Sequence, residues 1–235
     1  MTAPSSPAAD ADVLFEDDDI VVVNKPAGRI VHPAPGHAEG SVTEELVRSR
    51  PGMAAVGSRE RPGVVHRLDI ETSGVMVFAK TPRAYARLRA VFESHGKVTK
   101  TYLAVLHGAP RPPTGKLETT IGRKPWDSRR MAVDVPGGKR AVTHWTTLQR
   151  QGSLALVEFV IETGRTHQIR VHAAHLGHPV VGDALYGDKV KDRRLAIRPG
   201  RHLLHAVKLE FPHPVTGKML SFAARPPDEI GRAHV

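Results

Sequence analysis

The stretch VVHRLDIETSGVMVFAK, residues 64–80, sets a polar loop between two apolar runs. The second run, Val75 to Ala79, is apolar throughout and predicts a strand. The loop before it contains two small hydroxyl residues and Gly74, which let the backbone of a ligand come close. Asp69, the carboxylate of the His-Arg-Leu-Asp tetrad, therefore lies in a loop that a ligand can approach.

Asp69 has two interpretations from this segment alone. An aspartate in a turn accepts backbone hydrogen bonds and stabilises the loop. An ionised aspartate beside a ligand acts as a nucleophile or as a base. The segment favours neither interpretation, so the choice depends on the rest of the chain.

The surrounding sequence predicts a mixture of strands and helices. β-Branched runs and alternation predict strands at residues 20–23, 75–79, 100–108, 141–149 and 154–163, and a pair of strands within residues 203–227. Thr81 as N-cap, Pro82 at the first helical position and Gly96 beyond the end predict a helix. A second, short helix is predicted over residues 166–177, with Thr166 as its cap.

These elements predict a single domain of mixed α/β architecture over residues 12–228. Residues 1–11 are mainly Ala, Pro, Ser and Asp, which bury too little apolar surface to fold, so a disordered tail is expected there. Residues 229–235 are expected to form a second, short tail. No repeat and no Ser/Gly-rich linker divides the chain, although composition alone leaves room for two lobes.

The chain is basic and contains no cysteine. Lys and Arg exceed Asp and Glu by 34 − 24 = 10. The surface should therefore attract polyanions, with nucleic acid as the first partner to consider, although an inert basic surface would have the same composition. The lack of cysteine excludes disulfides and thiolate chemistry. The N-terminal residues resemble neither a signal peptide nor a spanning helix, so a cytoplasmic protein without membrane contact is expected.

Motifs for nucleotides and metals are missing or weak. Neither G-x-x-x-x-G-K-[ST] nor a G-x-G-x-x-G that opens a helix occurs, which argues against a nucleotide cofactor. His167, His172, His175 and His178 could hold a metal, and His172 and His175 could share a helix face, but no H-E-x-x-H occurs. Capping, core or RNA-contact roles are favoured for these histidines, and no metal is expected.

Three further stretches contain candidate site residues. KTYLAVLHG places Tyr102 in a predicted strand, ETGRTHQIR places Arg165 between a strand and a helix, and RHLLHAVKLEF contains Leu204. Each residue also has an ordinary structural interpretation when it is taken alone. Tyr102 and Leu204 would be core residues, and Arg165 would be a solvated cation of a turn.

Taken together, these stretches and the Asp69 segment, with VVNKPAG (22–28) and GHPVVGDALYG (177–187), resemble the RluA-type pseudouridine synthases, the family of ribosomal large subunit pseudouridine synthases. The order is the same, the resemblance covers residues 13–227, and H-R-L-D-x-x-T-S-G is its highly specific element. The resemblance implies an α+β fold with a central antiparallel sheet, flanking helices and an active-site cleft. It also implies an isomerase that converts uridine to pseudouridine in structured ribosomal or transfer RNA.

The resemblance also implies roles for five residues. Asp69 is implied as the catalytic aspartate, and Tyr102 as the aromatic residue that stacks on the target base. Arg165 is implied as the cation paired with the aspartate, Leu204 as an apolar wall of the pocket, and Arg67 as an arginine that helps to hold the base-flipped RNA. Many members carry an N-terminal S4-like RNA-binding domain. The short N-terminal segment leaves no room for one, so we expect the catalytic domain to select its RNA itself.

The implied reaction breaks the N1–C1′ bond of uridine, rotates the uracil and joins C5 to C1′. Nothing is oxidised and no group is donated, so no cofactor, nucleotide or metal is expected. A buried carboxylate stays ionised when a cation accompanies it, and Arg165 could hold Asp69 with two parallel hydrogen bonds. Extruding the uridine costs a few kcal/mol, which stacking on Tyr102 would partly return. Whether Asp69 attacks the sugar, attacks the base or removes a sugar proton stays open.

RNA contacts are expected from two basic stretches, residues 122–145 and 187–201, the first of which contains both tryptophans. Solvated hairpins are the alternative interpretation of these stretches. The candidate contacts to RNA are His66, Arg130, Lys139, His167 and Arg170. RNA is the expected partner, and the protein is expected to act as a monomer.

Two other functions fit parts of the pattern. A non-catalytic RNA-binding protein or RNA chaperone could use the same scaffold, but binding alone does not require a carboxylate that faces a polyanion. A metal-dependent phosphodiesterase acting on RNA could use the clustered histidines. Bound zinc or manganese would distinguish the phosphodiesterase from the isomerase.

Overall fold

The computed structural model describes residues 11–33, 39–94, 96–195 and 198–232, so the predicted disordered tail lies outside the described residues apart from Ala11. The chain folds into two compact units. The first unit contains the residues up to Val98 together with residues 208–224, and the second contains residues 99–207 and those from Arg225 onward.

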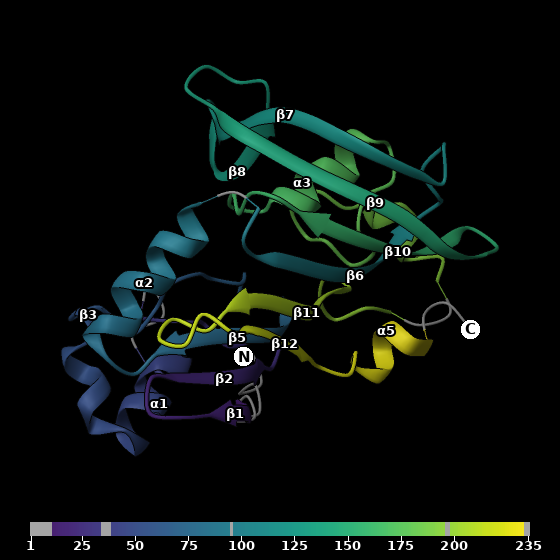
Figure 1. Ribbon diagram of the computed structural model, residues 1–235. Coiled ribbons are helices and arrows are strands. Elements are labelled where there is room, and N and C mark those ends of the chain that lie inside the picture. The colour runs from purple at the N-terminus through teal and green to yellow at the C-terminus, as the bar shows by residue number, and fades with distance from the viewer. Residues whose placement is uncertain (1–10, 34–38, 95, 196–197, 233–235) are drawn as a thin grey trace. The chain divides into compact units, whose positions relative to one another are not determined.

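The first unit is built on strands that follow one another in the order β1–β2–β5–β11, with β12 beside β11 (Figure 1). β2 pairs with β1 on one side and with β5 on the other, while β12 pairs with the end of β11. These strands are β1 (Asp12–Glu16), β2 (Ile20–Lys25), β5 (Ser73–Ala79), β11 (Leu204–Pro212, in this unit from Lys208) and β12 (Met219–Ala223). The other elements are α1 (Val42–Ser49), the 3-10 helix η1 (Pro51–Ala55), β3 (Gly57–Ser58), β4 (Arg61–Pro62) and α2 (Pro82–Glu93).

β5 lies at the centre of the first unit's core, because all seven of its residues are buried. Val75 of β5 and Leu88 of α2 belong to one apolar cluster with residues of β2 and β11. Thr81 caps α2, and its hydroxyl accepts a hydrogen bond from the backbone N–H of Ala84 at 3.1 Å. The predicted strand and the predicted Thr81-capped helix are confirmed, although the helix ends before Gly96.

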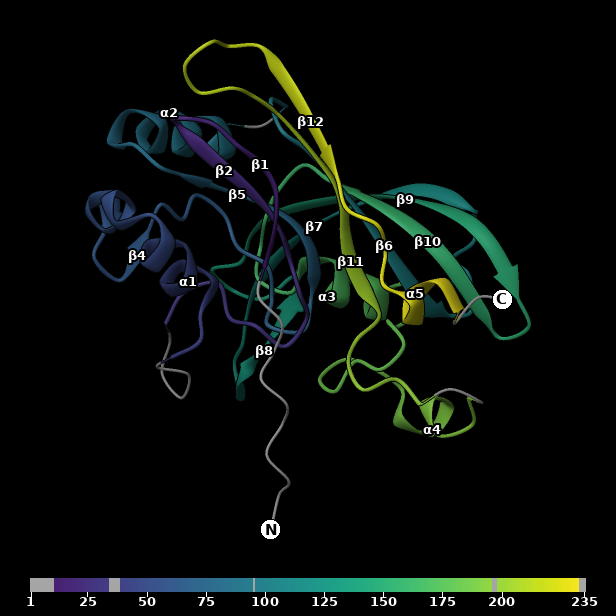
Figure 2. The same cartoon turned by 90° about the horizontal axis from the view of Figure 1, so that it is seen from below.

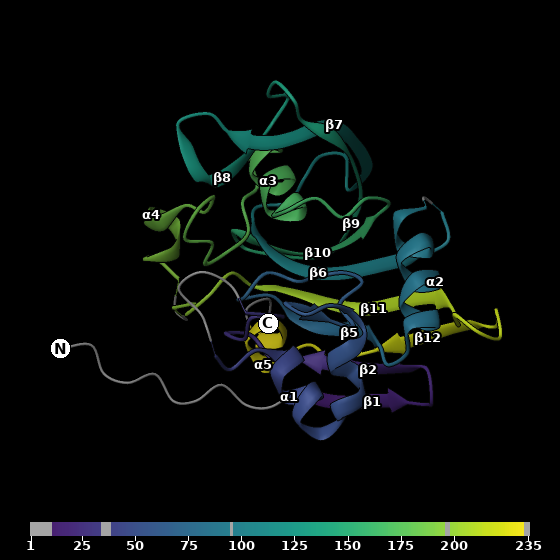
Figure 3. The ribbon, with the colours of Figure 1, turned by 90° about the vertical axis from the view of Figure 1, so that its left-hand side faces the viewer.

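The second unit contains an antiparallel sheet in the order β6–β10–β9–β7–β8. Its strands are β6 (Thr99–His107), β7 (Thr114–Lys124), β8 (Asp127–Val133), β9 (Lys139–Gln151) and β10 (Leu154–Ile161). Figure 3 shows that the outer strands curve around α3 (Gln168–His175). Val171 of α3 packs in one cluster with Ile121 and Ala141, so the helix closes the curved side of the sheet.

The start of α3 differs from the sequence prediction. Its N-cap is His167, which has a left-handed backbone with φ 56° and makes no side-chain capping hydrogen bond. The prediction that Thr166 caps this helix is therefore wrong. The left-handed turn at His167 sets the start of the helix one residue later than the capping rule for Ser and Thr would place it.

Two short helices complete the second unit. α4 (Lys189–Asp192) lies in the loop that leads to β11 (Figure 2), and α5 (Asp228–Arg232) follows β12 in the sequence. α5 differs from the tail expected from residue 229. Ile230 is buried in a cluster with Val105 and Leu203, and the Glu229 carboxylate forms an ion pair with Arg201 at 2.5 Å. One apolar residue in a short polar segment gives little signal in the sequence, and long-range packing decides its structure.

The predicted α+β class is confirmed, because antiparallel strands and packed helices make up both units. The predicted strands at 100–108, 141–149 and 154–163 are β6, β9 and β10. In the part of the chain that the structure describes, no helix is both long and apolar enough to cross a membrane.

Candidate active site

Asp69 lies in the loop between β4 and β5, which we name the Asp69 loop (residues 65–72). The Asp69 side chain is half-buried, between the buried Leu68 and the half-buried Ile70, while Arg67 is exposed. The backbone N–H of Thr72 donates a hydrogen bond of 3.1 Å to the Asp69 carbonyl, which closes a tight turn. The turn presents the carboxylate at the boundary between protein and solvent.

Lys25 holds this turn from beneath. The side chain is fully buried at the end of β2, and its Nζ donates hydrogen bonds to the carbonyls of Pro26, Arg29 and Ile70 at 2.8, 2.9 and 2.9 Å. The backbone N–H of Gly28 also donates to the Ile70 carbonyl, at 3.0 Å. Two segments that are far apart in the sequence, VVNKPAG and HRLD, are therefore joined at the residue that follows Asp69.

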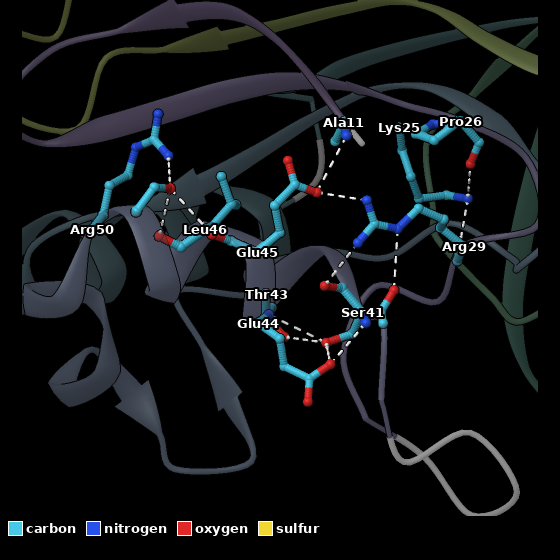
Figure 4. A network of polar contacts seen from close by, with 12 residues as sticks. Ala11, Lys25, Pro26, Arg29, Ser41, Thr43, Glu44, Glu45, Leu46 and Arg50 are labelled. Atoms are coloured by element: carbon cyan, nitrogen blue, oxygen red, sulfur yellow. Dashed lines mark hydrogen bonds and ion pairs between the residues drawn. The ribbon is translucent and has the colours of Figure 1, made fainter. Parts of the chain in front are cut away.

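Arg29 extends this network to the start of α1 (Figure 4). Its guanidinium donates to the Glu45 carboxylate at 2.6 Å, to the Gly40 carbonyl at 3.1 Å and to the Ser41 carbonyl at 3.3 Å. Ser41 caps α1 through a reciprocal capping box with Glu44. A buried arginine with a carboxylate and two carbonyls as acceptors is well satisfied, which makes the support of the Asp69 loop rigid.

His66 and Arg67 have different surroundings. His66 accepts a hydrogen bond at Nε2 from the backbone N–H of Val77 at 3.1 Å, and its ring stacks on Phe92 with centroids 4.7 Å apart. These contacts tie the loop to β5 and α2. Burial is the largest cause that lowers the pKa of His32, and the positive charges of Arg61 and Arg67 lower it further. The exposed Arg67 therefore contributes to a positive field around the loop.

In the second unit, Tyr102 lies on β6 and is 8% exposed. It pairs in the sheet with Phe159 of β10, and the two-residue period of a strand places Lys100 on the same face as Tyr102. Leu204, at the start of β11, is also buried. The sequence alone placed Tyr102 in a strand correctly, and the side chain is more enclosed than a solvent-facing ring.

Lys100 was not singled out by its sequence, and the structure places it beside Arg165. It is 8% exposed, and burial, followed by the positive charge of Arg165, lowers the pKa of Lys100 to about 8. The Nζ lies 3.7 Å from the position that a Cβ on Gly164 would occupy, so the ammonium lies against the turn that carries Arg165. A lysine two residues before Tyr102, on the strand face that continues with Ala104 and Leu106, is the signal that could have identified it.

The turn that carries Arg165 is fixed by Gln168. The Gln168 Oε1 accepts hydrogen bonds from the Arg165 backbone N–H at 3.0 Å and from the Thr163 hydroxyl at 2.8 Å. Its Nε2 donates to the Val142 carbonyl at 2.9 Å. The Arg165 Nε donates to the Arg140 carbonyl at 2.8 Å. The buried amide therefore sets the backbone of the turn, and β9 sets the direction of the guanidinium.

Among the candidate RNA contacts, Arg170 and His167 interact with the loop that follows α3. Arg170 is buried and forms a bidentate ion pair with Asp183 at 2.7 and 2.8 Å. Its guanidinium lies above the Tyr186 ring. The Nδ1 of His167 lies 2.8 Å from the Tyr186 hydroxyl. These contacts stabilise the loop after α3. Lys139 and Arg130 are more accessible to solvent than Arg170. The Nε of Arg130 lies 3.6 Å from the Asp127 carboxylate.

His172, the central histidine of the possible metal cluster, is a buried structural residue. Its Nδ1 lies 2.8 Å from the Thr143 hydroxyl and its Nε2 lies 3.0 Å from the Thr119 hydroxyl. Burial is the main cause that lowers the pKa of His172 to about 4, so the ring is neutral near pH 7. Both nitrogens have partners, and the ring is not available to a metal without breaking a hydrogen bond.

The two units therefore contain separate parts of the candidate site. Asp69 and Arg67 belong to the first unit, whereas Tyr102, Arg165 and Leu204 belong to the second. Within each unit the structure supplies the local support of these residues.

A known family matches the same part of the chain. The family described as RNA pseudouridylate synthase matches residues 19–175, which is more than half of the chain. The chain belongs to this family. The matched region contains the Asp69 loop, Tyr102 and Arg165, while Leu204 lies beyond it.

The family's relatives include bacterial and human proteins. An uncharacterized RNA pseudouridine synthase of Synechocystis sp. is 41% identical over 219 residues, which cover 92% of this chain and 65% of the relative. The ribosomal large subunit pseudouridine synthase D of Neisseria meningitidis is 44% identical over 226 residues, which cover 93% and 59%. The chain thus spans less than two thirds of the length of these two relatives.

A solved structure supports the fold. The human RNA pseudouridylate synthase domain containing 1 has a TM-score of 0.76 with this chain at 28% sequence identity. The similarity covers 96% of this chain and 87% of the human one. The predicted family and the predicted fold are both confirmed.

Proposed function

We propose that this protein is an RNA pseudouridine synthase that isomerises uridine to pseudouridine in structured ribosomal or transfer RNA in the cytoplasm. The observation that carries the proposal is the Asp69 loop. A half-buried carboxylate lies on a tight turn that a buried lysine supports, inside the region that the family matches. Such support suits a group that must meet one atom of a flipped nucleotide, because catalysis depends on geometry fixed before the substrate arrives.

In this proposal Asp69 is the catalytic residue and the second unit supplies the substrate pocket. Arg165 pairs with Asp69 and keeps the carboxylate ionised, because a nearby cation offsets the cost of burial. Tyr102 stacks on the extruded uracil, and Leu204 excludes water from the pocket. In this proposal these groups line one active-site cleft.

Lys100 adds a second cation to the proposed pocket. When the N1–C1′ bond breaks with its electron pair moving to N1, negative charge develops on the uracil. An ammonium close to Arg165 would stabilise that charge where little water competes. With a pKa of about 8, Lys100 is mostly protonated at pH 7 and can donate hydrogen bonds to the uracil oxygens.

RNA is bound mainly through its phosphates in this proposal. Arg67, Arg130 and Lys139 are accessible enough to contact phosphates, whereas His66 and His167 would contact RNA only with ring atoms that their protein partners leave available. The proposed enzyme uses no cofactor, nucleotide or metal, because the isomerisation neither oxidises the substrate nor transfers a group to it. It is proposed to act as a monomer.

The deciding experiment measures tritium release from RNA labelled at uridine C5, without added metal or nucleotide. Wild-type protein should release tritium, and Asp69→Asn should lower the rate at least about a thousandfold, as removal of a group that acts on the reacting atoms does in other enzymes. The same variant should bind RNA at least as tightly as wild type, because it removes a negative charge from a surface that faces phosphates.

Glu71→Gln is the matched control for this experiment. It removes the same charge from the same loop, and we expect its rate to stay within a few-fold of wild type. Equal rates for wild type and Asp69→Asn would exclude Asp69 as the catalytic residue. Tight RNA binding by a wild-type protein that releases no tritium from total cellular RNA or from ribosome-assembly intermediates would support the non-catalytic RNA-binding alternative.

A further inference from the structure

The chain contains two tryptophans, and they differ strongly in solvent exposure. Trp145 is 8% exposed on β9, and its indole N–H donates to the Pro112 carbonyl at 3.2 Å. Trp126 is 95% exposed, more than any other large hydrophobic side chain in the described residues, of which Met219 follows at 60%. An aromatic ring of this size usually buries about 150–250 Å² in a folded protein. Trp126 has no such role in this fold.

Trp126 lies at the tip of the β7–β8 hairpin, in the turn formed with Pro125. Lys124 and Asp127 pair on either side of this turn. Proline at the first central position of a tight turn is common, but the second position favours Gly, Asn or Asp, and nothing in turn geometry requires tryptophan there. The turn therefore does not explain the residue either.

Several cations are close to this ring in the sequence. We name residues 123–130 the hairpin tip; it contains Arg123, Lys124, Arg129 and Arg130 against the single acid Asp127, a net charge of 4 − 1 = +3. Arg123 of β7 pairs with Met131 of β8, but the next residue of β7, Lys124, pairs with Asp127. The three residues of β8 between these two pairs, Ser128, Arg129 and Arg130, therefore form a bulge. Arg129 is 81% exposed. An aromatic face is thus presented among positive charges.

The stem below the tip is held in place. The backbone N–H of Met131 donates to the Tyr186 hydroxyl at 2.8 Å, and within the hairpin tip Arg123 donates to the Ser128 carbonyl. Ile121 of β7 is buried in the cluster that contains Val171 of α3. The tip therefore projects from a fixed stem, so binding has to order the exposed ring but not the strands that carry it.

We propose that the hairpin tip is a second RNA-binding site, in which Trp126 stacks on an unpaired base other than the target uridine and the surrounding cations bind the adjoining phosphates. Aromatic stacking combined with basic side chains is the common solution for binding single-stranded nucleic acid. An acidic protein partner would use the charges but would not require a flat ring. The inference rests on the proposed function for the identity of the nucleic acid.

The experiment compares two RNAs of equal length, one a hairpin with an unpaired loop and the other a blunt duplex. Trp126→Ala should weaken binding to the hairpin RNA by about 5- to 100-fold, the range expected for one stacked base. It should change binding to the duplex less than twofold, and Trp126→Phe should retain most of the affinity for the hairpin RNA. Because the side chain is exposed, the variant should unfold at the wild-type temperature.

Leu148→Ala is the matched control, since it truncates another exposed apolar residue of the same unit, at 51% exposure. It should bind both RNAs as wild type does. In a Trp145→Phe background the emission of Trp126 can be followed directly, and the hairpin RNA should quench it more strongly than the duplex. Equal affinity of Trp126→Ala and wild type for the hairpin RNA, or an equal loss on both RNAs, would overturn the proposal.

These binding measurements do not depend on turnover. If wild type releases no tritium but Trp126→Ala still loses affinity for the hairpin RNA alone, the proposed function fails and the stacking site stands. If wild type is active and Trp126→Ala binds like wild type, the stacking site alone fails.

Discussion

The Asp69 loop joins two strands and the hairpin tip joins two others, and both contain charged residues, but they are held in opposite ways. The Asp69 loop is fixed by a distant segment, in which the buried Lys25 ammonium and the backbone N–H of Gly28 both donate to the carbonyl of Ile70. The hairpin tip is held at its stem, while Trp126 and Arg129 stand in solvent.

This contrast shows which side chains the fold holds in position and which it leaves accessible. A group that reacts with a substrate must be positioned to a fraction of an ångström, so the protein surrounds its loop with satisfied buried polar groups. A surface that recognises RNA by stacking and charge tolerates local adjustment and needs access instead. The same residue type, lysine, is therefore expected to have different importance in the two regions.

The largest effect is expected from Lys25→Met. The substitution keeps an apolar stem of similar size but removes the donor for three carbonyls, so we expect the free energy of unfolding to fall by about 3 kcal/mol or more. Urea unfolding at pH 7 measures this change. Turnover should also fall at a temperature at which the variant is folded, because the turn that holds Asp69 loses its support.

Lys124→Met, at the exposed edge of the hairpin tip, is the counterpart in the other region. The free energy of unfolding should change by less than about 0.5 kcal/mol, as is usual for exposed substitutions. Similar losses of stability for the two lysine variants would show that the supposed contrast between the regions does not exist.

A smaller effect of opposite sign is expected from Lys100→Met. Burial and Arg165 lower the pKa of Lys100 from its ordinary value of 10.5 to about 8. Between pH 8 and pH 10.5 the unfolded chain therefore binds more protons than the folded one, and this residue makes stability rise with pH. Its charged form is a cost to folding below pH 8, so the variant should be more stable than wild type at pH 7 by on the order of 2 kcal/mol.

Unfolding of wild type and Lys100→Met at pH 7, 8, 9 and 10 tests this prediction. The difference in stability should shrink as the pH rises, while tritium release by the variant should be slower than by wild type at pH 7. Lys97→Met, which removes an exposed lysine nearby, controls for net charge. A constant difference between Lys100→Met and wild type across this pH range would contradict the assigned direction of the pKa shift.

The smallest effect on the fold is expected from Arg129→Gln. Arg129 is exposed, and its Nε lies 3.5 Å from the Asp127 carboxylate, a pair that contributes little in water. The free energy of unfolding should stay within about 0.5 kcal/mol of wild type, while the slope of log affinity for RNA against log salt should become shallower by about one. An unchanged slope would remove Arg129 from the phosphate contacts.

Local sequence patterns predicted a large part of the fold. β2 contains a run of β-branched residues, β5 contains an apolar run, and α2 has a threonine cap followed by proline, so short-range preferences alone identify them. The Asp69 loop was also identified, because its motif is contiguous and specific. Contiguous motifs of this kind can be recognised without knowledge of the tertiary contacts.

Long-range contacts decided the rest. α5 forms because Ile230 finds an apolar cluster, and α3 begins at a left-handed histidine that no capping rule predicts. The candidate contact Arg170 is paired with Asp183 inside the protein. Whether an arginine is buried in a pair or presented to RNA depends on which distant residues surround it, and a local pattern does not contain that information.

The family, the strands around the Asp69 loop and the candidate catalytic aspartate thus followed from the order of residues in the chain. Which charges are buried and which aromatic ring is exposed followed only from the folded arrangement: Lys25 beneath the loop, Lys100 beside Arg165, and Trp126 in solvent while Trp145 is in the sheet. The physical reason is that secondary structure follows from neighbours in the chain, whereas desolvation depends on neighbours in space.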